Sequence, residues 1–165
     1  MQILEFVTWE KTVLPAWRSN HPDIVAPNES IWTQFPNDIM WHSALIEADD
    51  INKLCLIGSV DWLEVFQTFR LWDLCKNFAS ALQSNDKYKH IDRIKALQSF
   101  YTTGKTLAPL IVVAPDCEGP YVLVDGNHRA SALLLNEMLI GQAVHIGTSK
   151  NIPDHVEFYQ HSVTM

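Results

Sequence analysis

The sequence predicts an α+β protein in which helices flank a mixed β-sheet, preceded by an irregular N-terminal extension. Three observations support this fold class: helical periodicity in the middle of the chain, short β-branched runs towards its end, and a start rich in proline and tryptophan. The chain has 165 residues, enough for one domain with a buried core or one domain plus an extension. A hydrophobic share of 47% and a charged share of 19% are typical of a globular protein.

The first 50 residues are predicted to form the irregular extension. Prolines and tryptophans alternate here: Trp9, Pro15, Trp17, Pro22, Pro27, Trp32, Pro36 and Trp41. Proline at this density disfavours long helices and central strands, although residues 3–8 could form a short strand. The tryptophans indicate an ordered arm that packs on the core, and an aromatic recognition surface is the alternative. We therefore divide the chain into an extension, 1–50, and a domain, 51–165.

Two helices follow a short strand in the middle of the chain. Residues 54–57 form an apolar run that predicts a buried strand. Asp61 has the position of a helix N-cap, with Glu64 completing a capping box. Apolar residues then recur every three or four positions, which predicts one helix over 62–82 and a second over 91–101. In both helices the apolar face is expected to pack on the core.

The last third of the chain alternates apolar runs with turns. A β-branched run predicts a strand over 110–113, and a turn at 116–120 separates it from a strand over 121–124. These two strands are expected to form a hairpin-like pair. An Ala- and Leu-rich segment predicts a helix over 130–138, followed by a last strand over 143–146.

The motif with the clearest chemistry is Asp125-Gly126-Asn127-His128-Arg129, between a strand and a helix. Gly126 lets the backbone turn sharply, and the first turn of a helix offers free N–H groups and a partial positive charge. His128 and Arg129 add donors at the same end, so the motif predicts a phosphate site. Asp125 could orient His128, act as a base or hold Mg²⁺. An ordinary turn in which Asp125 caps the helix is the alternative.

The stretch from about 91 to 149 resembles the ParB/sulfiredoxin superfamily. The pattern of that superfamily is a helix, a Gly turn, a Pro before a hydrophobic strand, a second strand, and a Gly-x-x-Arg box that opens a helix. This chain has these features at Gly104, at Pro109 and in the box 126–129. The resemblance implies a small ParB/sulfiredoxin-like domain.

Members of this superfamily differ in chemistry. Sulfiredoxins carry a nucleophilic Cys where this chain has Asn127, so we expect no sulfiredoxin activity. The Asp-Gly-His-His-Arg box of free-serine kinases, which binds adenine nucleotide, is more similar. It implies that Gly126, Asn127, His128 and Arg129 hold the phosphates of ATP or ADP, with Mg²⁺. It also implies a kinase-like phosphotransferase in which Asp125 and His128 are catalytic.

Composition and charge limit the kinds of ligand and partner that the protein is expected to bind. The formal net charge of −7 and the lack of a basic stripe disfavour nucleic acid. Cys55, Cys75 and Cys117 have no metal-site spacing and are expected to be reduced thiols, and no protein-bound metal is predicted. With no leader-like start and no apolar run of about 18 residues, we expect a cytoplasmic protein that does not enter the membrane.

Two other functions stay open beside the phosphotransferase. One is a non-catalytic, nucleotide-regulated protein-binding module that uses the tryptophan-rich region. The other is a ParB-like nuclease or toxin-type enzyme that acts on nucleic acid or a nucleotide. For a phosphotransferase, the acceptor is an unidentified small molecule or protein. Asp61 and Glu64 are weaker candidates than Asp125 for the base that activates this acceptor.

Overall fold

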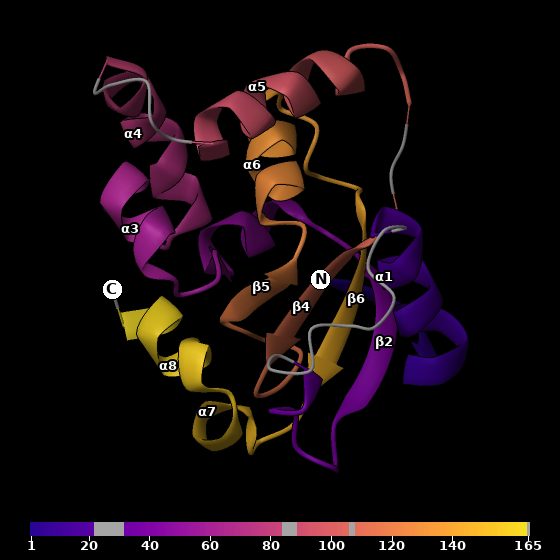
Figure 1. Ribbon diagram of the computed structural model, residues 1–165. Coiled ribbons are helices and arrows are strands. Elements are labelled where there is room, and N and C mark those ends of the chain that lie inside the picture. The colour runs from indigo at the N-terminus through magenta and orange to yellow at the C-terminus, as the bar shows by residue number, and fades with distance from the viewer. Residues whose placement is uncertain (22–31, 84–88, 106–107, 165) are drawn as a thin grey trace.

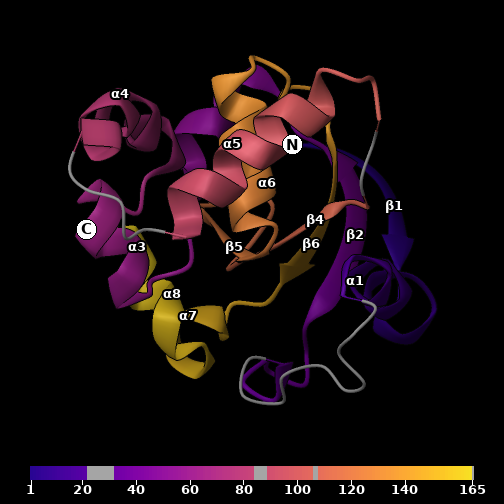
Figure 2. The same cartoon turned by 45° about the horizontal axis from the view of Figure 1, so that its top comes forward.

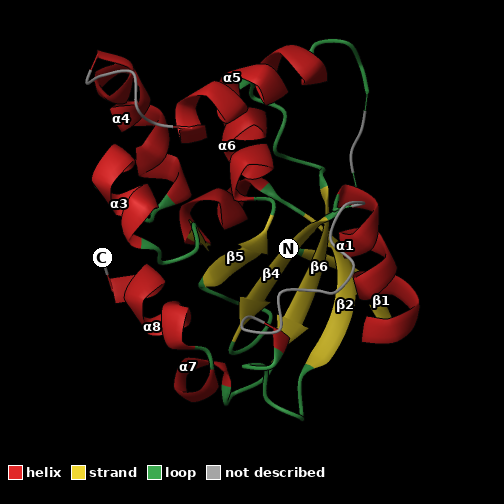
Figure 3. Ribbon diagram, viewed as in Figure 1, coloured by secondary structure: helices red, strands yellow, loops and turns green. Residues whose placement is uncertain are grey.

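A computed structural model describes residues 1–21, 32–83, 89–105 and 108–164 (Figure 1). They form an α+β fold with helices on both sides of a mixed sheet (Figure 3), which confirms the predicted fold class. In the described residues the sheet has six strands in the order β1-β2-β6-β4-β5-β3. The strands are β1 (Gln2–Val7), β2 (Met40–Leu45), β3 (Leu54–Cys55), β4 (Leu110–Ala114), β5 (Tyr121–Asp125) and β6 (Ala143–Thr148).

The centre of the sheet combines both strand directions. β4 and β5 form the expected antiparallel pair, and β4 and β6 run parallel. The chain passes from β5 to β6 through helix α6 (Asn127–Leu135), which begins three residues earlier than predicted. Because only Gly126 separates β5 from α6, the first turn of α6 lies directly at the carboxyl end of β5.

The N-terminal segment contributes two strands to the same sheet. β1 pairs with β2, and β2 pairs with β6 over its whole length. The expectation of an irregular extension is therefore wrong for β2, because the two described prolines of this segment lie outside the strands, while Pro22 and Pro27 lie outside the described residues. Pro15 occupies the first turn of α1 (Leu14–Asn20), and Pro36 precedes β2. The division at residue 50 stays a prediction, although the sheet crosses it.

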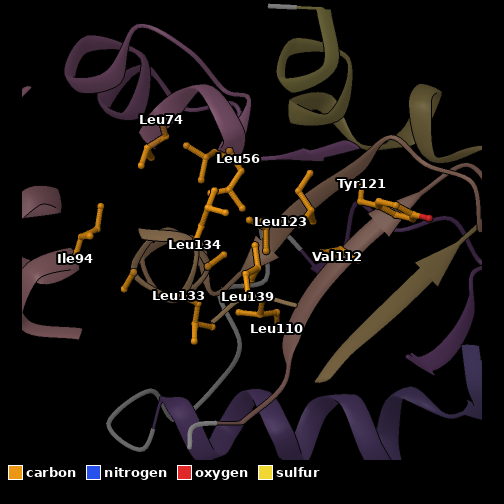
Figure 4. Close-up of a cluster of buried hydrophobic side chains, with 14 of the residues drawn as sticks. Leu56, Leu74, Ile94, Leu110, Val112, Tyr121, Leu123, Leu133, Leu134 and Leu139 are labelled. Atoms are coloured by element: carbon orange, nitrogen blue, oxygen red, sulfur yellow. The ribbon is translucent and has the colours of Figure 1, made fainter. Parts of the chain in front are cut away.

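Alternate residues of β4 face opposite sides of the sheet. Leu110, Val112 and Ala114 belong to one buried cluster, and Ile111 and Val113 belong to another. Figure 4 shows part of the first cluster, where strand residues meet leucines of α6. All five side chains of this strand are fully or almost fully buried, as expected for a central strand covered on both faces.

Different helices cover the two faces. Figures 1 and 2 show α5 lying across α6, with α3 and α4 beside them. The first cluster receives residues from α3 (Val60–Phe66), α4 (Leu71–Gln83), α5 (Lys89–Tyr101) and α6. The second cluster receives residues from the π-helix η1 (Trp9–Val13), α1, α7 (Ile152–His155) and α8 (Glu157–Thr164). No helix among the described residues is long and apolar enough to cross a membrane.

The single helix predicted over 62–82 is two helices, α3 and α4. The backbone leaves the helix at Gln67, which takes a left-handed conformation with φ of 55°. Phe69 then turns into the core, and its carbonyl accepts a hydrogen bond of 2.6 Å from the N–H of Leu56. Phe69 lies in the break but is as buried as the apolar residues of the two helices. The apolar spacing in the sequence therefore runs through the break without interruption. The predicted N-cap at Asp61 is also wrong, since Ser59 holds that position and Asp61 lies in the first turn.

Candidate functional site

A cleft of about 330 Å³ opens at the carboxyl end of β5, where α6 begins. The motif predicted from the sequence forms its floor, and the end of α1, α3 and α5 form its walls. The cleft is lined by Ser19, Asn20, His21, Trp62, Arg93, Leu97, Asp125, Gly126, Asn127, His128 and Arg129. The five motif residues therefore lie together in one concave site, as expected of a small-molecule pocket.

Gly126 makes the sharp turn into α6 possible. Its φ is 92°, in the left-handed region that favours glycine. A Cβ at this position would lie 2.5 Å from Cδ2 of Leu110 and 3.0 Å from Nη2 of Arg129. Gly126 is the N-cap of α6, and no side chain in the described residues caps the first turn. The first N–H groups of α6 therefore remain available for an acceptor in the cleft.

Asp125 and Arg129 form an ion pair across the start of α6. Nη2 of Arg129 donates to Oδ2 of Asp125 at 2.8 Å, and the arginine is 7% exposed. Nη1 of Arg129 donates to the carbonyl of Ala108 and lies 3.5 Å from that of Pro109. The other oxygen of Asp125 lies 3.6 Å from Nε2 of His21. Arg129 thus joins the start of β4 to the end of β5.

Asn127 connects α6 to the loop after β3. Its Oδ1 accepts a hydrogen bond of 2.9 Å from the N–H of Ile57, and its Nδ2 donates to the carbonyl of Leu123 at 3.4 Å. Both polar ends of the side chain are therefore engaged within the protein. The resemblance to sulfiredoxins puts the nucleophile at this position, whereas here the side chain has a bracing role.

His128 belongs to a chain of three polar side chains from three helices. Its Nε2 lies 2.8 Å from Nδ1 of His90 in α5, and Nε2 of His90 lies 2.9 Å from Oδ2 of Asp61 in α3. The two imidazole rings stack at 4.9 Å. The ring of Trp62 lies 4.3 Å from that of His90 and 4.9 Å from that of His128. The buried indole thus fixes one side of the pair.

The surroundings of this chain favour neutral His128 and ionised Asp61. Burial, together with the charges of Arg93 and His90, lowers the pKa of His128 from about 6.5 to about 3. Burial alone would raise the pKa of Asp61, but hydrogen bonds from Ser59 and His90 outweigh it, so this pKa lies below its ordinary value. Near neutral pH the chain therefore has a carboxylate at one end and a neutral imidazole at the other.

Arg93 supplies a cation at the mouth of the cleft. It is exposed on α5, and it makes no hydrogen bond or ion pair with the residues that the structure describes. Both side chains line the cleft, and the positive charge of Arg93 helps to lower the pKa of His128. Unlike Arg129, this guanidinium has its donors available for an anionic ligand.

The sequence identified the floor of the site, offered Asp61 only as a weaker candidate for the base, and missed Arg93 and His90. In the sequence, Arg93 is typical of a solvated helix face, His90 has no recognisable motif spacing, and Asp61 resembles a helix cap. No spacing rule links positions 61, 90 and 128, because three helices must pack before these side chains meet.

Metal and thiol chemistry find little support in the described residues. No group of three or more His, Cys, Asp or Glu side chains there is placed to hold a metal ion. The three cysteines are free, and burial raises the pKa of the Cys55 thiol to about 11, which disfavours the reactive thiolate. None of the cysteines lines the cleft.

Comparisons with protein-family models, curated proteins and solved structures find no match to this chain. The geometry of the cleft is therefore the basis for any functional conclusion.

Proposed function

We propose that this protein binds the phosphates of ATP or ADP in the cleft at the start of α6 and transfers a phosphoryl group to an acceptor. One observation carries the proposal. The cleft combines uncapped N–H groups at a helix N-terminus, the guanidinium of Arg93, unpaired among the described residues, and the neutral imidazole of His128. Phosphoryl transfer depends mainly on positioning and charge neutralisation, which such a set supplies.

The groups best placed to bind the phosphates are the backbone N–H groups in the first turn of α6 and the guanidinium of Arg93. A helix N-terminus carries about half a positive charge and N–H groups that point at an anion. The left-handed backbone of Gly126 turns the chain so that these groups open the helix at the cleft, and a Cβ there would clash with Leu110 and Arg129. Asn127, His128 and Arg129 then contribute their backbone N–H groups rather than their side chains, two of which are engaged elsewhere.

Asp125 remains a candidate to stand beside the transferred group or its Mg²⁺. Its carboxylate is held at the cleft by Arg129 and lies near His21. Mg²⁺ in nucleotide sites usually takes one or two carboxylates and keeps phosphate and water ligands, so a single protein carboxylate is compatible with it. Arg129 in this proposal orients Asp125.

Membership of the ParB/sulfiredoxin superfamily is part of the same proposal. Its support is the order of elements, namely α5, β4, β5, the glycine turn and α6. The engaged side chain of Asn127 is consistent with a member that lacks sulfiredoxin chemistry. We place such a phosphotransferase in the cytoplasm, where its three free cysteines would stay reduced.

Calorimetry with ATP, ADP and AMP, with and without Mg²⁺, tests the binding step. We expect Arg93→Ala to weaken ATP binding about 10- to 100-fold, the effect of losing one or two charge-assisted hydrogen bonds. Lys95→Ala is the matched control, because it removes the same charge from an exposed position of the same helix outside the cleft. Failure of every nucleotide to bind the wild type contradicts the proposal, as does an equal effect of the two variants.

A second cleft supports the alternative of a nucleotide-regulated binding module. It measures about 400 Å³ and is lined mainly by aromatic and apolar side chains, among them Phe6, Trp9, Trp32 and Trp41. A protein that binds ATP without turnover and loses a partner on Phe6→Ala would favour this alternative. Phe6 is 62% exposed, so this substitution leaves the core intact.

A further inference from the structure

Asp61, His90 and His128 form a continuous hydrogen-bonded path from the cleft to solvent. The links measure 2.9 and 2.8 Å, and the three residues come from α3, α5 and α6. The side chain of Asp61 is 61% exposed, that of His90 is 16% exposed, and His128 lines the cleft. Exposure therefore rises from His90 to Asp61, at the solvent end of the path.

The path dictates which nitrogen atoms carry protons. Ionised Asp61 can only accept, so Nε2 of His90 must donate to it. When His90 is neutral, its Nδ1 is an acceptor, so Nε2 of His128 donates to that atom. Neutral His128 is left with an unprotonated Nδ1. No residue in the described part of the chain hydrogen-bonds to this atom.

His128 lines the cleft, and an unprotonated imidazole nitrogen can act there as a general base. The charged and titratable groups around His128 are Asp61 from α3, His90 and Arg93 from α5, His21 from α1, and the pair Asp125–Arg129 from the turn into α6. In the free cleft, burial and Arg93 disfavour imidazolium. Phosphate charge beside Arg93 offsets that cation, so a bound nucleotide strengthens the base.

We propose that Nδ1 of His128 is the general base that activates an acceptor hydroxyl in this cleft, and that His90 and Asp61 fix its tautomer and conduct its proton to solvent. The inference rests on the proposed function. His128 is the catalytic residue because it touches the acceptor, whereas His90 and Asp61 are positioning residues.

The transfer begins when the hydroxyl proton moves to Nδ1 of His128 and an oxygen lone pair forms a bond to the γ-phosphorus. The bond from that phosphorus to the β,γ-bridging oxygen breaks, and its electron pair leaves on ADP. His128 then passes its Nε2 proton to Nδ1 of His90, and His90 passes its own Nε2 proton to Asp61. Exposed Asp61 releases that proton to water, so the relay ends with both imidazoles neutral and their tautomers reversed. Both rings return to their starting tautomers through solvent exchange.

Nitrogen NMR of protein labelled at histidine tests the tautomers directly, without any substitution. At pH 7 we expect a protonated Nε2 and an unprotonated Nδ1 on both His90 and His128. The variants His90→Gln and His128→Asn assign the two rings, because each removes one set of signals. In His90→Gln we expect the His128 ring to lose its single tautomer and become a mixture. A proton on Nδ1 of His128 in the wild type overturns the proposal.

Turnover tests the role of the base. The probe is Mg·ATP with water as the acceptor, followed as ADP formation. We expect His128→Asn to lower kcat about 100-fold or more with KM within twofold of the wild type, the usual range for loss of a general base. His90→Phe, which keeps a ring against Trp62, is expected to lower kcat about 10-fold. His161→Asn is the control, since it lies outside the cleft and should keep the wild-type rate.

The outcomes separate this inference from the function on which it rests. A protein that shows the expected tautomers but binds no Mg·ATP contradicts the proposed function alone. A protein that binds Mg·ATP but carries its proton on Nδ1 of His128 contradicts this inference alone. Binding without any ADP formation, or equal kcat values for the wild type and His128→Asn, also overturns the base assignment.

Discussion

At the residue scale, Gly126 meets two separate requirements in one position. Its backbone is left-handed, and the space beside its Cα is already occupied by Leu110 and Arg129. The chain offers a glycine that meets only the first requirement. Gly141 has a φ of 81°, and a methyl group added to its Cα would meet no atom within 4 Å. Alanine substitutions at Gly126 and at Gly141 can therefore distinguish backbone strain from steric conflict.

We expect Gly126→Ala to destabilise the protein by about 2–4 kcal/mol and Gly141→Ala by about 1 kcal/mol. Both variants place alanine in a left-handed conformation, and only the first forces a methyl group against Leu110 and the Arg129 guanidinium. Urea unfolding at pH 7 measures both values. Equal losses would show that the core beside Gly126 relaxes freely.

His128 makes stability depend on pH in a defined direction. Its pKa is about 6.5 in the unfolded chain and about 3 in the folded protein, so the unfolded chain binds more protons between these values. The part of the stability that depends on neutral His128 is therefore fully present above about pH 6.5 and is lost as the pH falls towards 3. We expect His128→Gln to show a shallower loss than the wild type in urea unfolding between pH 7 and 4.

Two other histidines, His145 and His161, bear on the controls for that measurement. Burial also lowers the pKa of His145, so part of the acid sensitivity stays in the variant. His161→Gln is the matched control and should follow the wild-type curve. A His128→Gln curve parallel to the wild type at every pH would contradict the buried, neutral state of this imidazole.

At the element scale, the start of α6 is positioned by side chains that the sequence predicts to bind a ligand. Asn127 ties the helix to Ile57 after β3, and Arg129 ties it to the start of β4. These contacts hold the backbone N–H groups of the first turn in the cleft. The motif therefore acts as a rigid frame, and the ligand-facing groups are its backbone, His128 and the neighbouring Arg93.

Asn127 allows the frame and the anion site to be tested separately. Asn127→Asp keeps an oxygen that accepts from Ile57 and adds a negative charge to the first turn of α6, so we expect stability within about 1 kcal/mol of the wild type. The same charge should weaken ATP binding at least about 10-fold. Asn127→Ala removes the acceptor and should cost about 1–3 kcal/mol of stability.

Urea unfolding and calorimetry on the same samples distinguish these variants. An Asn127→Asp protein that binds ATP as tightly as the wild type would show that the phosphates do not lie at this helix end. Unchanged stability of Asn127→Ala would show that the bond to Ile57 contributes nothing measurable.

Helices and strands that are determined by their own apolar spacing and turn residues were predicted well. β4, β5 and α5 lie within a few residues of their predicted positions because their apolar periods and turn residues agree. The break between α3 and α4 could not be predicted, since a backbone bond between Phe69 and Leu56 stabilises it from outside the segment. The contacts of His90 with Asp61 and with His128 escaped prediction for the same reason, because these side chains meet only through helix packing.

At the scale of the whole molecule, the N-terminal segment is structurally part of the sheet. β2 covers the edge of β6 and β1 covers β2, while Trp17 and Trp41 fill the second buried cluster. The cleft also needs this segment, because Ser19, Asn20 and His21 line it. The tryptophans thus serve mainly as core residues.

We expect a fragment of residues 51–165 to lack a cooperative unfolding transition. Removing β1 and β2 leaves an open edge on β6 and exposes the cluster that faces α1, a loss of apolar burial comparable with the stability of a typical domain, about 5–15 kcal/mol. Circular dichroism during heating, with size-exclusion chromatography, measures this. A sharp transition in a monomeric fragment would instead establish 51–165 as an independent domain.

The pairing of β1 with β2 shifts register between Ile3 and Glu5, and this shift has a consequence for self-association. β1 is the outer strand of the sheet, and it exposes Ile3, Leu4 and Phe6. An apolar outer strand is a ready template for fibrils when its N–H and C=O groups form an even row. Leu4 is an extra residue between the paired positions Ile3 and Glu5, so the row is interrupted near its middle. The bulge therefore protects against strand-by-strand stacking of one copy of the protein on the next.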